Sequence, residues 1–340
     1  MMEKVPTIKD VASLAQVHAA TASRALNPQT RNKVSPETAT RILEAAKTLG
    51  YAPNSAARSL RTRTSLVAGV IIPDLRNPVF PPIVRGIEDA LREAGYMALL
   101  GNTDGDVERE SELLAAMRGR QTDGFILATG RRDLRPETDR VRGVPTVLVN
   151  RRSESSDIPS VTANSHAGVV GLVGLLVSCG HRRIANLAGP QNLSTGWERH
   201  QAFRDAMTAH GIEVEQRLVR YCDAFTEDSG VRAARDLFAA EPDITAVVAG
   251  NDLIALGCYQ VLAERGLRCP SDVSVVGFND MPFVDKQRPA LTTVRIPHYE
   301  LGVESARLLL ERIGDPEAPA KQVVLPIQIV ERESVAPPRI

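Results

Sequence analysis

Three asparagines stand where apolar, strand-like runs end, and their amides could hydrogen-bond a polar small molecule. Asn150 follows PTVLV, Asn251 follows TAVVAG and Asn279 follows VSVVGF. Ligands of open parallel sheets bind outside the carboxyl ends of the strands, so we expect these side chains to face one cleft. Asparagine and aspartate are also common turn and N-cap residues, and Asp252 could serve only as a helix cap.

A second chemistry, the reading of DNA bases, is indicated near the N-terminus. A short helix is expected over residues 19–27, and its outward residues are small or polar: Ala19, Ala20, Thr21, Ser23, Arg24 and Asn27. Small outward residues let a helix backbone sit deep in a major groove, where Arg24 could form a bidentate hydrogen bond to guanine. The alternative is an ordinary pair of core helices.

Enzymatic chemistry is not indicated. The sequence contains no H-E-x-x-H, G-x-S-x-G or G-x-x-x-x-G-K-[ST] motif. Its four cysteines form no C-x-x-C pair and its histidines are not clustered, which argues against a zinc site or a redox motif. The glycines of residues 168–174 lie inside an apolar helical run, so we expect them to mark close packing. We therefore predict a binding protein that needs no metal or cofactor.

The elements that would position the DNA-reading residues are short helices. Thr7 and Asp10 form a capping signature. The apolar stripe that follows is interrupted at residues 16–18 and consists of Val11, Ala12, Leu14, Ala15, Ala22, Ala25 and Leu26. Two short helices that share a small core describe a helix-turn-helix. A third helix is expected to begin at Ser35-Pro36-Glu37 and to end at Gly50.

From residue 66 onward, apolar runs rich in β-branched residues alternate with helical patterns. The first run is LVAGVII, and MALLGNT, DGFILAT and PTVLVN follow it. A second series contains RRIANLAGP, RLVRYC, TAVVAG and VSVVGF. Repeated strand–helix units predict parallel doubly wound sheets, here in two halves.

Ordered motifs along nearly the whole chain resemble the lactose repressor family. TIKDVA…TASRALN, VSPET…LGYAPN and SAARSLRT are similar to the family's DNA-binding headpiece and hinge. GVIIPDLRNPVF, DGFIL, GHRRIANLAGP, NDLIALG, VSVVGFND and LTTVRIP are similar to its effector domain. The resemblance implies an all-α helix-turn-helix headpiece with a hinge helix, followed by an α/β two-lobed domain of the periplasmic-binding-protein type.

The resemblance also implies domain boundaries. We expect the headpiece at residues 1–53, the hinge helix and linker at 54–64, and the effector-binding and dimerisation domain at 65–340. Its N-lobe would take about 65–163 and 293–325, and its C-lobe about 164–292 and 326–340. The chain would therefore cross between the lobes near Ala163, Thr292 and Leu325.

The hinge segment predicts a helix of about two turns, which is marginal on its own. The resemblance implies that the hinge helices of two protomers pair in the minor groove, with Leu60 as an apolar wedge and Ala57 at their contact. Arg58 would contact phosphate beside the wedge, and Thr7 and His18 complete the expected DNA-binding set. The alternative for Leu60 is a linker residue tucked against the body.

Two residues depart from the family pattern in the turn before the second helix. Gln16 stands where relatives usually have glycine, and a left-handed backbone there would cost roughly 1 kcal/mol or more. His18 replaces the usual serine N-cap, so the second helix should begin more weakly. Both predict a headpiece of modest stability.

For the effector site, the resemblance favours a binding role for the three strand-end asparagines and adds Arg199. Phe80 could line the cleft or belong to the core. Trp197, the only tryptophan, lies two residues before Arg199, so its emission is expected to report cleft occupancy. Asn279 is neutral where many relatives have aspartate, which puts an effector preference inferred from carboxylate contacts in doubt.

Charge is distributed unevenly. Residues 1–63 contain ten Lys/Arg and four Asp/Glu, a net charge of +6, whereas the rest contains 31 and 37, a net charge of −6. A basic head on an acidic body suggests that the head alone meets a polyanion. The first ten residues lack the apolar core of a signal peptide, and the longest apolar run, 167–177, is too short to span a bilayer. A cytoplasmic protein without membrane contact is expected.

These observations predict a homodimeric transcriptional regulator, a repressor in particular, that binds a near-palindromic DNA operator. A small-molecule effector in the inter-lobe cleft would control its DNA affinity. Sugars or sugar derivatives are the commonest effectors in the family and purines occur too; induction and corepression both stay open. The alternative class is an exported sugar-binding protein of a transporter, which would need a signal peptide and would not need the basic first sixty residues.

Overall fold

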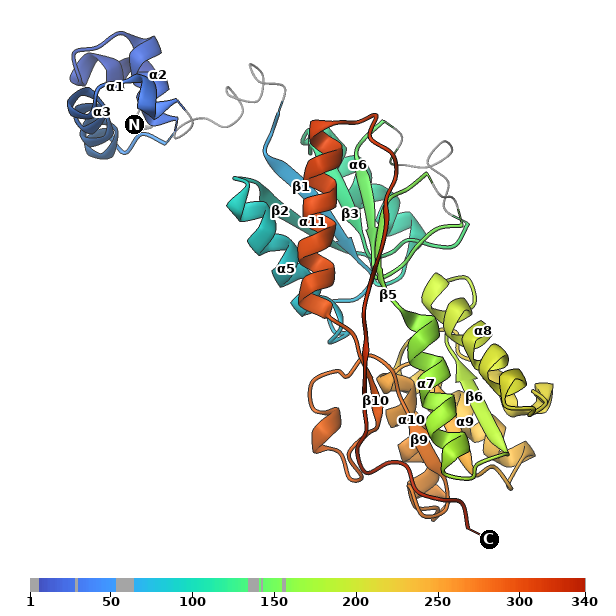
Figure 1. The fold of residues 1–340 in the computed structure, drawn as a ribbon. Helices are drawn as coiled ribbons and strands as arrows, with labels where there is room; N and C mark the ends of the chain where they lie inside the picture. The colour runs from blue at the N-terminus through green and yellow to red at the C-terminus, as the bar shows by residue number, and fades with distance from the viewer. Residues whose placement is uncertain are drawn as a thin grey trace. The chain divides into compact units, whose positions relative to one another are not determined.

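The computed structural model describes residues 6–27, 30–52, 64–133, 141, 143–154 and 157–339. Contacts divide the chain into two compact units, Met1–Ser65 and Leu66–Ile340 (Figure 1). Each unit has its own hydrophobic core and is described by itself.

The first unit is a bundle of short helices: α1 (Ile8–Leu14), α2 (Ala19–Leu26), the 3-10 turn η1 (Arg31–Lys33) and α3 (Pro36–Leu49). The predicted caps are confirmed. The Asp10 carboxylate accepts hydrogen bonds from the Thr7 N–H and hydroxyl, both at 2.7 Å. Ser35 is the N-cap of α3, and Gly50 ends that helix with a φ of 62°.

The core of this unit is made mostly of alanine. Its buried residues are Val11, Ala12, Ala15, Ala22, Ala25, Ala39, Ile42, Ala45 and Ala46. The predicted stripe is therefore correct except at Leu14, which is 51% exposed. Leu14 is the last residue of α1, and its side chain faces solvent although the next residue, Ala15, is buried in the core. Leu26 is partly buried against this core.

The turn between α1 and α2 has the two predicted irregularities. Gln16 has a φ of 51°, in the left-handed region that glycine adopts more easily. His18 is the N-cap of α2, and its Nδ1 accepts a hydrogen bond from the Ala20 N–H at 3.2 Å. The ring nitrogen thus replaces the hydroxyl oxygen of a serine cap.

The second unit has two lobes, each built on a parallel sheet. The N-lobe sheet has the strand order β11-β5-β4-β3-β1-β2. Its strands are β1 (Val67–Ile72), β2 (Met97–Asn102), β3 (Gly124–Leu127), β4 (Thr146–Val149), β5 (Ser160–Ala163) and β11 (Gln322–Leu325), and its helices are α5 (Phe80–Glu93), α6 (Val107–Gly119) and α11 (His298–Gly314).

Alternation along β1 explains how helices cover both faces of this sheet. Ala68, Val70 and Ile72 pack in the cluster that contains residues of α5 and α11, whereas Ile71 packs with Leu114 of α6. Strands buried on both faces read as continuous apolar runs, which is the pattern of this segment.

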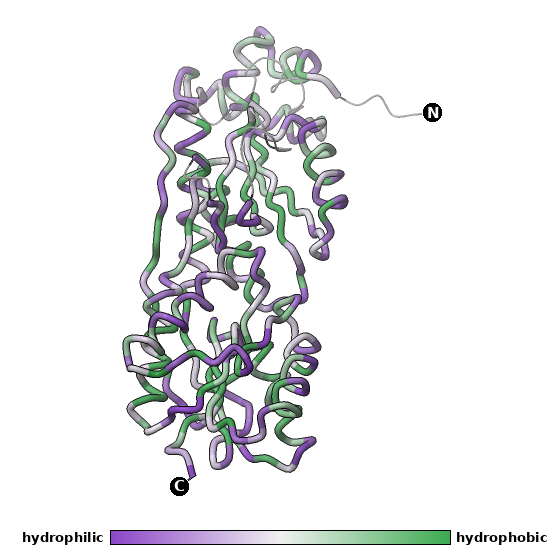
Figure 2. The backbone as a smooth tube through the Cα atoms, turned by 90° about the vertical axis from the view of Figure 1, so that its right-hand side faces the viewer, coloured by the Kyte–Doolittle hydropathy of each residue, from purple (hydrophilic) through white to green (hydrophobic). Residues whose placement is uncertain are grey.

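The C-lobe sheet has the strand order β7-β6-β8-β9, all parallel. Its strands are β6 (Ile184–Ala188), β7 (Val219–Tyr221), β8 (Ala246–Ala249) and β9 (Ser274–Val276). The helices of this lobe are α7 (Ser165–Ser178), α8 (Ser194–Ala209), α9 (Glu227–Ala240) and α10 (Asp252–Glu264), and the 3-10 turns are η2 (Gln216–Leu218) and η3 (Val284–Lys286). Figure 2 shows hydrophobic segments running through the interior of both lobes.

The apolar run at 167–177 is the buried helix α7, as expected. A Cβ at Gly168 would lie 2.8 Å from Phe278, and one at Gly171 would lie 2.2 Å from Ile329. Gly174 has room for a side chain. The expectation of close packing is therefore confirmed at two of the three glycines.

Three crossings join the lobes. The chain passes from β5 to α7 at Asn164, from β10 (Thr293–Arg295) to α11, and from β11 to β12 (Gln328–Val330). Strands β10 and β12 pair antiparallel, and Thr292 bridges to Val276 of β9. The second crossing thus follows residue 295, whereas the sequence places it near Thr292. No helix in the described part of the chain is both long and apolar enough to cross a membrane.

Candidate functional site

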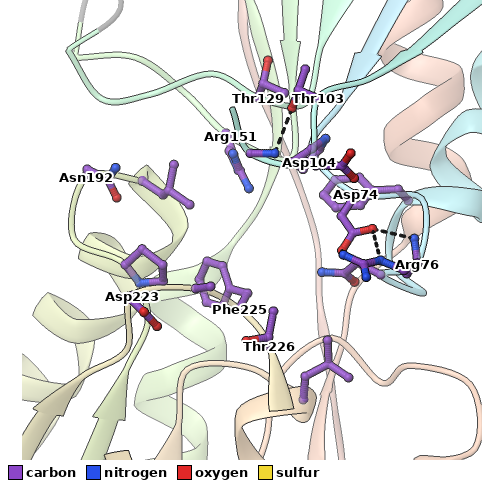
Figure 3. A pocket seen from close by; sticks show the side chains of 18 of the residues that line it. Asp74, Arg76, Thr103, Asp104, Thr129, Arg151, Asn192, Asp223, Phe225 and Thr226 are labelled. Atoms are coloured by element: carbon purple, nitrogen blue, oxygen red, sulfur yellow. Dashed lines mark hydrogen bonds and ion pairs between the residues drawn. The ribbon is translucent and has the colours of Figure 1, made fainter. Parts of the chain in front are cut away.

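A cavity of about 700 Å³ lies between the two lobes, at the carboxyl ends of their strands (Figure 3). Its N-lobe walls include Pro73 after β1, Thr103 after β2 and Thr129 after β3. The C-lobe contributes Pro190 after β6 and Phe225 after β7. This is where open parallel sheets bind ligands, and the volume suits a small molecule.

A second, smaller hollow of about 20 Å³ adjoins this cavity, and we call it the deep end. The two spaces share Asn77, Phe80, Arg151 and Phe225. The deep end is lined by Asn77, Val79, Phe80, Asn150, Arg151, Thr195, Arg199, Phe225, Asn251 and Asn279. Five of the six side chains that the sequence predicts for effector binding therefore lie together, and only Trp197 lies elsewhere.

Arg199, on α8, is held from several sides. Its guanidinium donates to the Gly250 carbonyl at 2.8 Å and to Asn279 Oδ1 at 3.2 Å, and it lies 3.7 Å from the centroid of the Phe278 ring. Its Nε is buried and has no hydrogen-bond partner among the described residues. Burial lowers the pKa of this guanidinium to about 9, so it remains a cation at neutral pH.

The strand-end asparagines are placed by unusual backbone. Asn150 has a φ of 62°, a value that asparagine tolerates better than most residues, and Asn279 has a φ of 120°. Asn251 is the N-cap of α10, and its Oδ1 accepts from the Ile254 N–H at 2.9 Å. The Asn251 side chain therefore both caps α10 and lines the cleft.

Asp252 is not a helix cap, which corrects the sequence interpretation. It is the first residue of α10, and its carboxylate accepts from the Met281 N–H at 2.8 Å and the Thr293 hydroxyl at 2.6 Å. The side chain thus ties α10 to the segment after β9 and to β10. Burial raises the pKa of this carboxyl to about 6.

Arg151 is a cleft residue that the sequence analysis missed. It follows Asn150 at the end of β4, is 8% exposed, and points into the space between the lobes (Figure 3). Its Nε has no hydrogen-bond partner in the described part of the chain. Burial lowers the pKa of this guanidinium to about 10. Thr129 Oγ1, also on the cavity wall, is likewise buried without a partner in the described residues.

Trp197 lies beside the cavity, in a contact that joins the two lobes. The Arg132 guanidinium, from the loop after β3, stacks 4.4 Å from the centroid of its ring and donates to the Gln191 carbonyl at 3.0 Å. Nearby, Arg152 forms an ion pair with Glu198. The environment of Trp197 therefore depends on how the lobes meet, rather than on direct contact with a molecule in the deep end.

No cluster of His, Cys, Asp or Glu suited to a metal ion is found in the part of the chain that the structure describes.

On the helix-turn-helix unit, the expected DNA-contacting side chains differ in exposure. His18, Ala20 and Arg24 are exposed, whereas Ala19, Thr21, Ser23 and Asn27 are half-buried. Thr7 is exposed, but its hydroxyl is used in the cap of α1. Ala57, Arg58 and Leu60 lie outside the described residues.

Two further arginines of this unit hold helix ends. Arg41 Nε donates to the Ala15 carbonyl at the end of α1, and Arg31 Nε donates to the Ala25 carbonyl near the end of α2, both at 3.0 Å. A positive charge at a helix C-terminus is favourable. Arg31 and Arg41 therefore stabilise the helix-turn-helix motif. Arg24, on α2, is exposed.

Comparisons with known proteins agree with this arrangement. The family model for bacterial regulatory proteins of the lacI family matches residues 7–54, and the model for periplasmic binding protein-like domains matches residues 173–335. The chain is 36% identical over 337 residues to the HTH-type transcriptional regulator CelR of Thermobifida fusca, covering 97% of this chain and 98% of that protein.

Solved structures match over the same length. A transcriptional regulator CelR–cellobiose complex has a TM-score of 0.75 and 34% identity, covering 97% of this chain and 99% of that chain. A lac repressor dimer bound to operator and the anti-inducer ONPF has a TM-score of 0.84 and 26% identity, covering 98% and 100%. The protein therefore belongs to the lacI family of bacterial regulatory proteins and is a DNA-binding transcriptional regulator, not an enzyme.

Proposed function

We propose that the protein is a homodimeric repressor whose affinity for a near-palindromic operator is set by a sugar or sugar derivative bound between the lobes. The observation that carries the proposal is the cavity itself. Both lobes line it, and the buried Nε donors of Arg151 and Arg199 have no hydrogen-bond partner among the described residues. A ligand that satisfies groups from both lobes must favour one lobe orientation over another.

The DNA-binding part of the proposal assigns residues 1–53 to the headpiece and 54–64 to the hinge. Arg24 would read a base edge, and Ala19 and Ala20 would allow close approach to the groove. Ala57, Arg58 and Leu60 would act in the minor groove, an assignment that rests on the family resemblance. The lac repressor dimer bound to operator, to which the chain is similar, supports the two-fold arrangement.

The effector part assigns Arg199, Asn150, Asn251 and Asn279 to hydrogen bonds with the ligand, and Phe80 to an apolar contact. The CelR–cellobiose complex, to which the chain is similar, supports a sugar in this cavity. Trp197 would report lobe closure through its contact with Arg132.

Coupling between the sites would run through the lobes. In a dimer, lobe orientation would set the distance between the two chain entries at Leu66, and thus whether two marginal hinge helices can pair. Ligand and DNA must then alter each other's affinity by the same factor, typically 1–3 kcal/mol.

We also propose a cytoplasmic location, because a regulator acts where the DNA is and the relatives are bacterial transcriptional regulators. The alternative, an exported sugar-binding protein, shares the two-lobed fold. It is disfavoured because the lacI family model matches residues 7–54, which such a protein would not need.

Operator affinity with and without an added sugar tests the proposal, in wild type and in Arg199→Ala. If the ligand is an inducer, the variant should bind the operator as tightly as wild type without ligand, and added ligand should no longer release it from the operator. If it is a corepressor, the variant should fail to bind tightly even with ligand present. Arg204→Ala, which removes an exposed arginine of the same helix outside the cavity, is the control. An unchanged ligand response in Arg199→Ala would contradict the assignment of the cleft.

A further inference from the structure

The deep end of the cavity is rich in donors and poor in acceptors. Among the described residues that line it, two are arginines, four are asparagines and none is an acid. Three of the asparagine oxygens are already used, since Asn77 Oδ1 accepts from the Val79 N–H, Asn251 Oδ1 from the Ile254 N–H and Asn279 Oδ1 from Arg199. A sugar hydroxyl both donates and accepts, whereas a carboxylate or phosphate only accepts. The remaining groups fit an acceptor best.

Arg151 adds a buried charge whose Nε has no hydrogen-bond partner in the part of the chain that the structure describes. It is almost fully buried. A buried charge without a hydrogen-bonded partner is strongly unfavourable, and a planar guanidinium matches the geometry of a carboxylate or phosphate. A hydroxyl could accept one of its hydrogen bonds but would leave the charge in place.

Nearby acids do not take this role. Asp252, which attracts Arg199, uses both carboxylate oxygens on Met281 and Thr293. Glu110, on the wall of the larger cavity, attracts Arg151 electrostatically, and the buried Nε of Arg151 still has no hydrogen-bond partner among the described residues.

Three other acids of the larger cavity, Asp74, Asp104 and Asp223, are paired with arginines. Asp74 lies 3.0 Å from Arg76, and Asp104 forms an ion pair with Arg109. Glu227 and Asp228 also line it and lie in the first turn of α9, where negative charge is favourable. The positive charges of the deep end therefore face the cavity, whereas these acids are engaged around it.

We infer that the effector carries an acidic group, a carboxylate or a phosphate, which Arg151 and Arg199 hold where the deep end opens into the larger cavity, while its polyhydroxyl body fills the larger cavity. This inference rests on the proposed effector function and narrows its ligand to sugar acids and sugar phosphates. Arg151 is then a specificity-determining residue, because it separates an acidic sugar from its neutral parent.

The first experiment compares matched ligands on the full-length protein. Calorimetric titration with glucose, gluconate, glucuronate, glucose 6-phosphate, ribose and ribose 5-phosphate separates the neutral parents from the two acidic classes. Acidic members should bind roughly tenfold to a hundredfold tighter than their parents, as expected for charge-assisted hydrogen bonds. Neutral parents that bind as tightly as their acids would overturn the inference.

Variants assign the effect to Arg151. Arg151→Met should abolish the ratio between the affinities for acids and for their neutral parents, and Arg151→Lys should restore part of that ratio. Arg76→Met removes a cation from the wall of the same cavity, but Arg76 is 84% exposed and paired with Asp74, so the preference should persist. Equal loss in Arg76→Met and Arg151→Met would overturn the assignment.

A ligand-independent measurement decides the case in which none of these sugars binds. Inorganic phosphate, added at constant ionic strength, should raise the melting temperature of the wild type more than that of Arg151→Met. Equal shifts would overturn the inference.

Operator binding separates this inference from the proposed function. A neutral sugar that alters operator affinity would leave the proposed function intact and refute the acidic ligand. An acid that binds through Arg151 without altering operator affinity would support the acidic ligand and contradict the proposed function.

Discussion

The helix-turn-helix unit and the inter-lobe cavity keep their functional side chains in opposite states. Arg24 on α2 is exposed, whereas Arg199 and Arg151 are buried beside the cavity. The first can meet a partner without cost to the protein. Arg199 and Arg151 are buried cations even without a ligand, which lowers the stability of the folded protein. The large hydrophobic cores of the lobes must offset this unfavourable free energy. Recognition of a polyanion can thus rest on a small alanine-rich core, whereas recognition of a small molecule needs a large one.

The largest expected effect concerns the exposed, basic helix-turn-helix unit and is the dependence of operator affinity on salt. Operator affinity should fall by on the order of 10³ to 10⁵ between about 50 and 200 mM salt, if six to ten phosphates are contacted. Filter binding or anisotropy across this range measures the slope. Binding that is insensitive to salt would show that the basic head does not act through phosphates.

The next effect tests whether the alanine-rich core is the weak one. Ile42→Ala should cost roughly 2–5 kcal/mol of headpiece stability, because it removes one of the two large side chains of that core. Leu43→Ala, at a neighbouring position that is 37% exposed, is the matched control and should cost far less. Calorimetry should show the second unit unaffected; coincident loss of both units would contradict independent cores.

The third prediction concerns Asp252 and the cost of buried charge. Its pKa is raised to about 6, so its folded state holds a proton more tightly than its unfolded state. Its contribution to stability is therefore present at low pH and is lost as pH rises from about 4 to about 6, by on the order of 2–3 kcal/mol. The stability difference between wild type and Asp252→Asn, measured by denaturant unfolding across this range, should change with pH. A constant difference would show that the carboxyl titrates normally.

The smallest effect is at one base pair. Arg24→Ala should cost about 1–3 kcal/mol at one position of each half-site and relax discrimination there. Affinities for a set of single-base operator variants measure this. A uniform loss over all sequences would assign Arg24 to a phosphate instead.

The fold was predictable where each local signal had one meaning. Caps at Thr7, Ser35 and Gly50 mark the headpiece helices, and continuous apolar runs mark strands covered on both faces. Leu14 was misplaced because helical spacing does not say where the helix ends. Val11, Ala12 and Ala15 already fill the buried face of α1, and Leu14 lies at its solvent-exposed edge.

The cleft was predictable only in part. The strand-end position of Asn150, Asn251 and Asn279 follows from sheet geometry, and the structure gathers them. The roles of Asn251 and Asp252 were not separable, because both residue types cap helices and the choice depends on where the strand stops. Arg151 carried no signal, since an arginine after a strand is normally solvated and its burial depends on the opposite lobe.

Two of the crossings between the lobes run side by side, because Arg295 of β10 is paired with Gln328 of β12. Each contains a proline, Pro297 in one and Pro326 in the other. A proline fixes one of the two soft backbone torsions of its residue, and paired strands cannot slide past each other without breaking hydrogen bonds. Relative movement of the lobes is thereby narrowed to few degrees of freedom, with bending about the paired strands favoured over shear. The two lobes are therefore expected to rotate about the paired strands β10 and β12 rather than to slide along them.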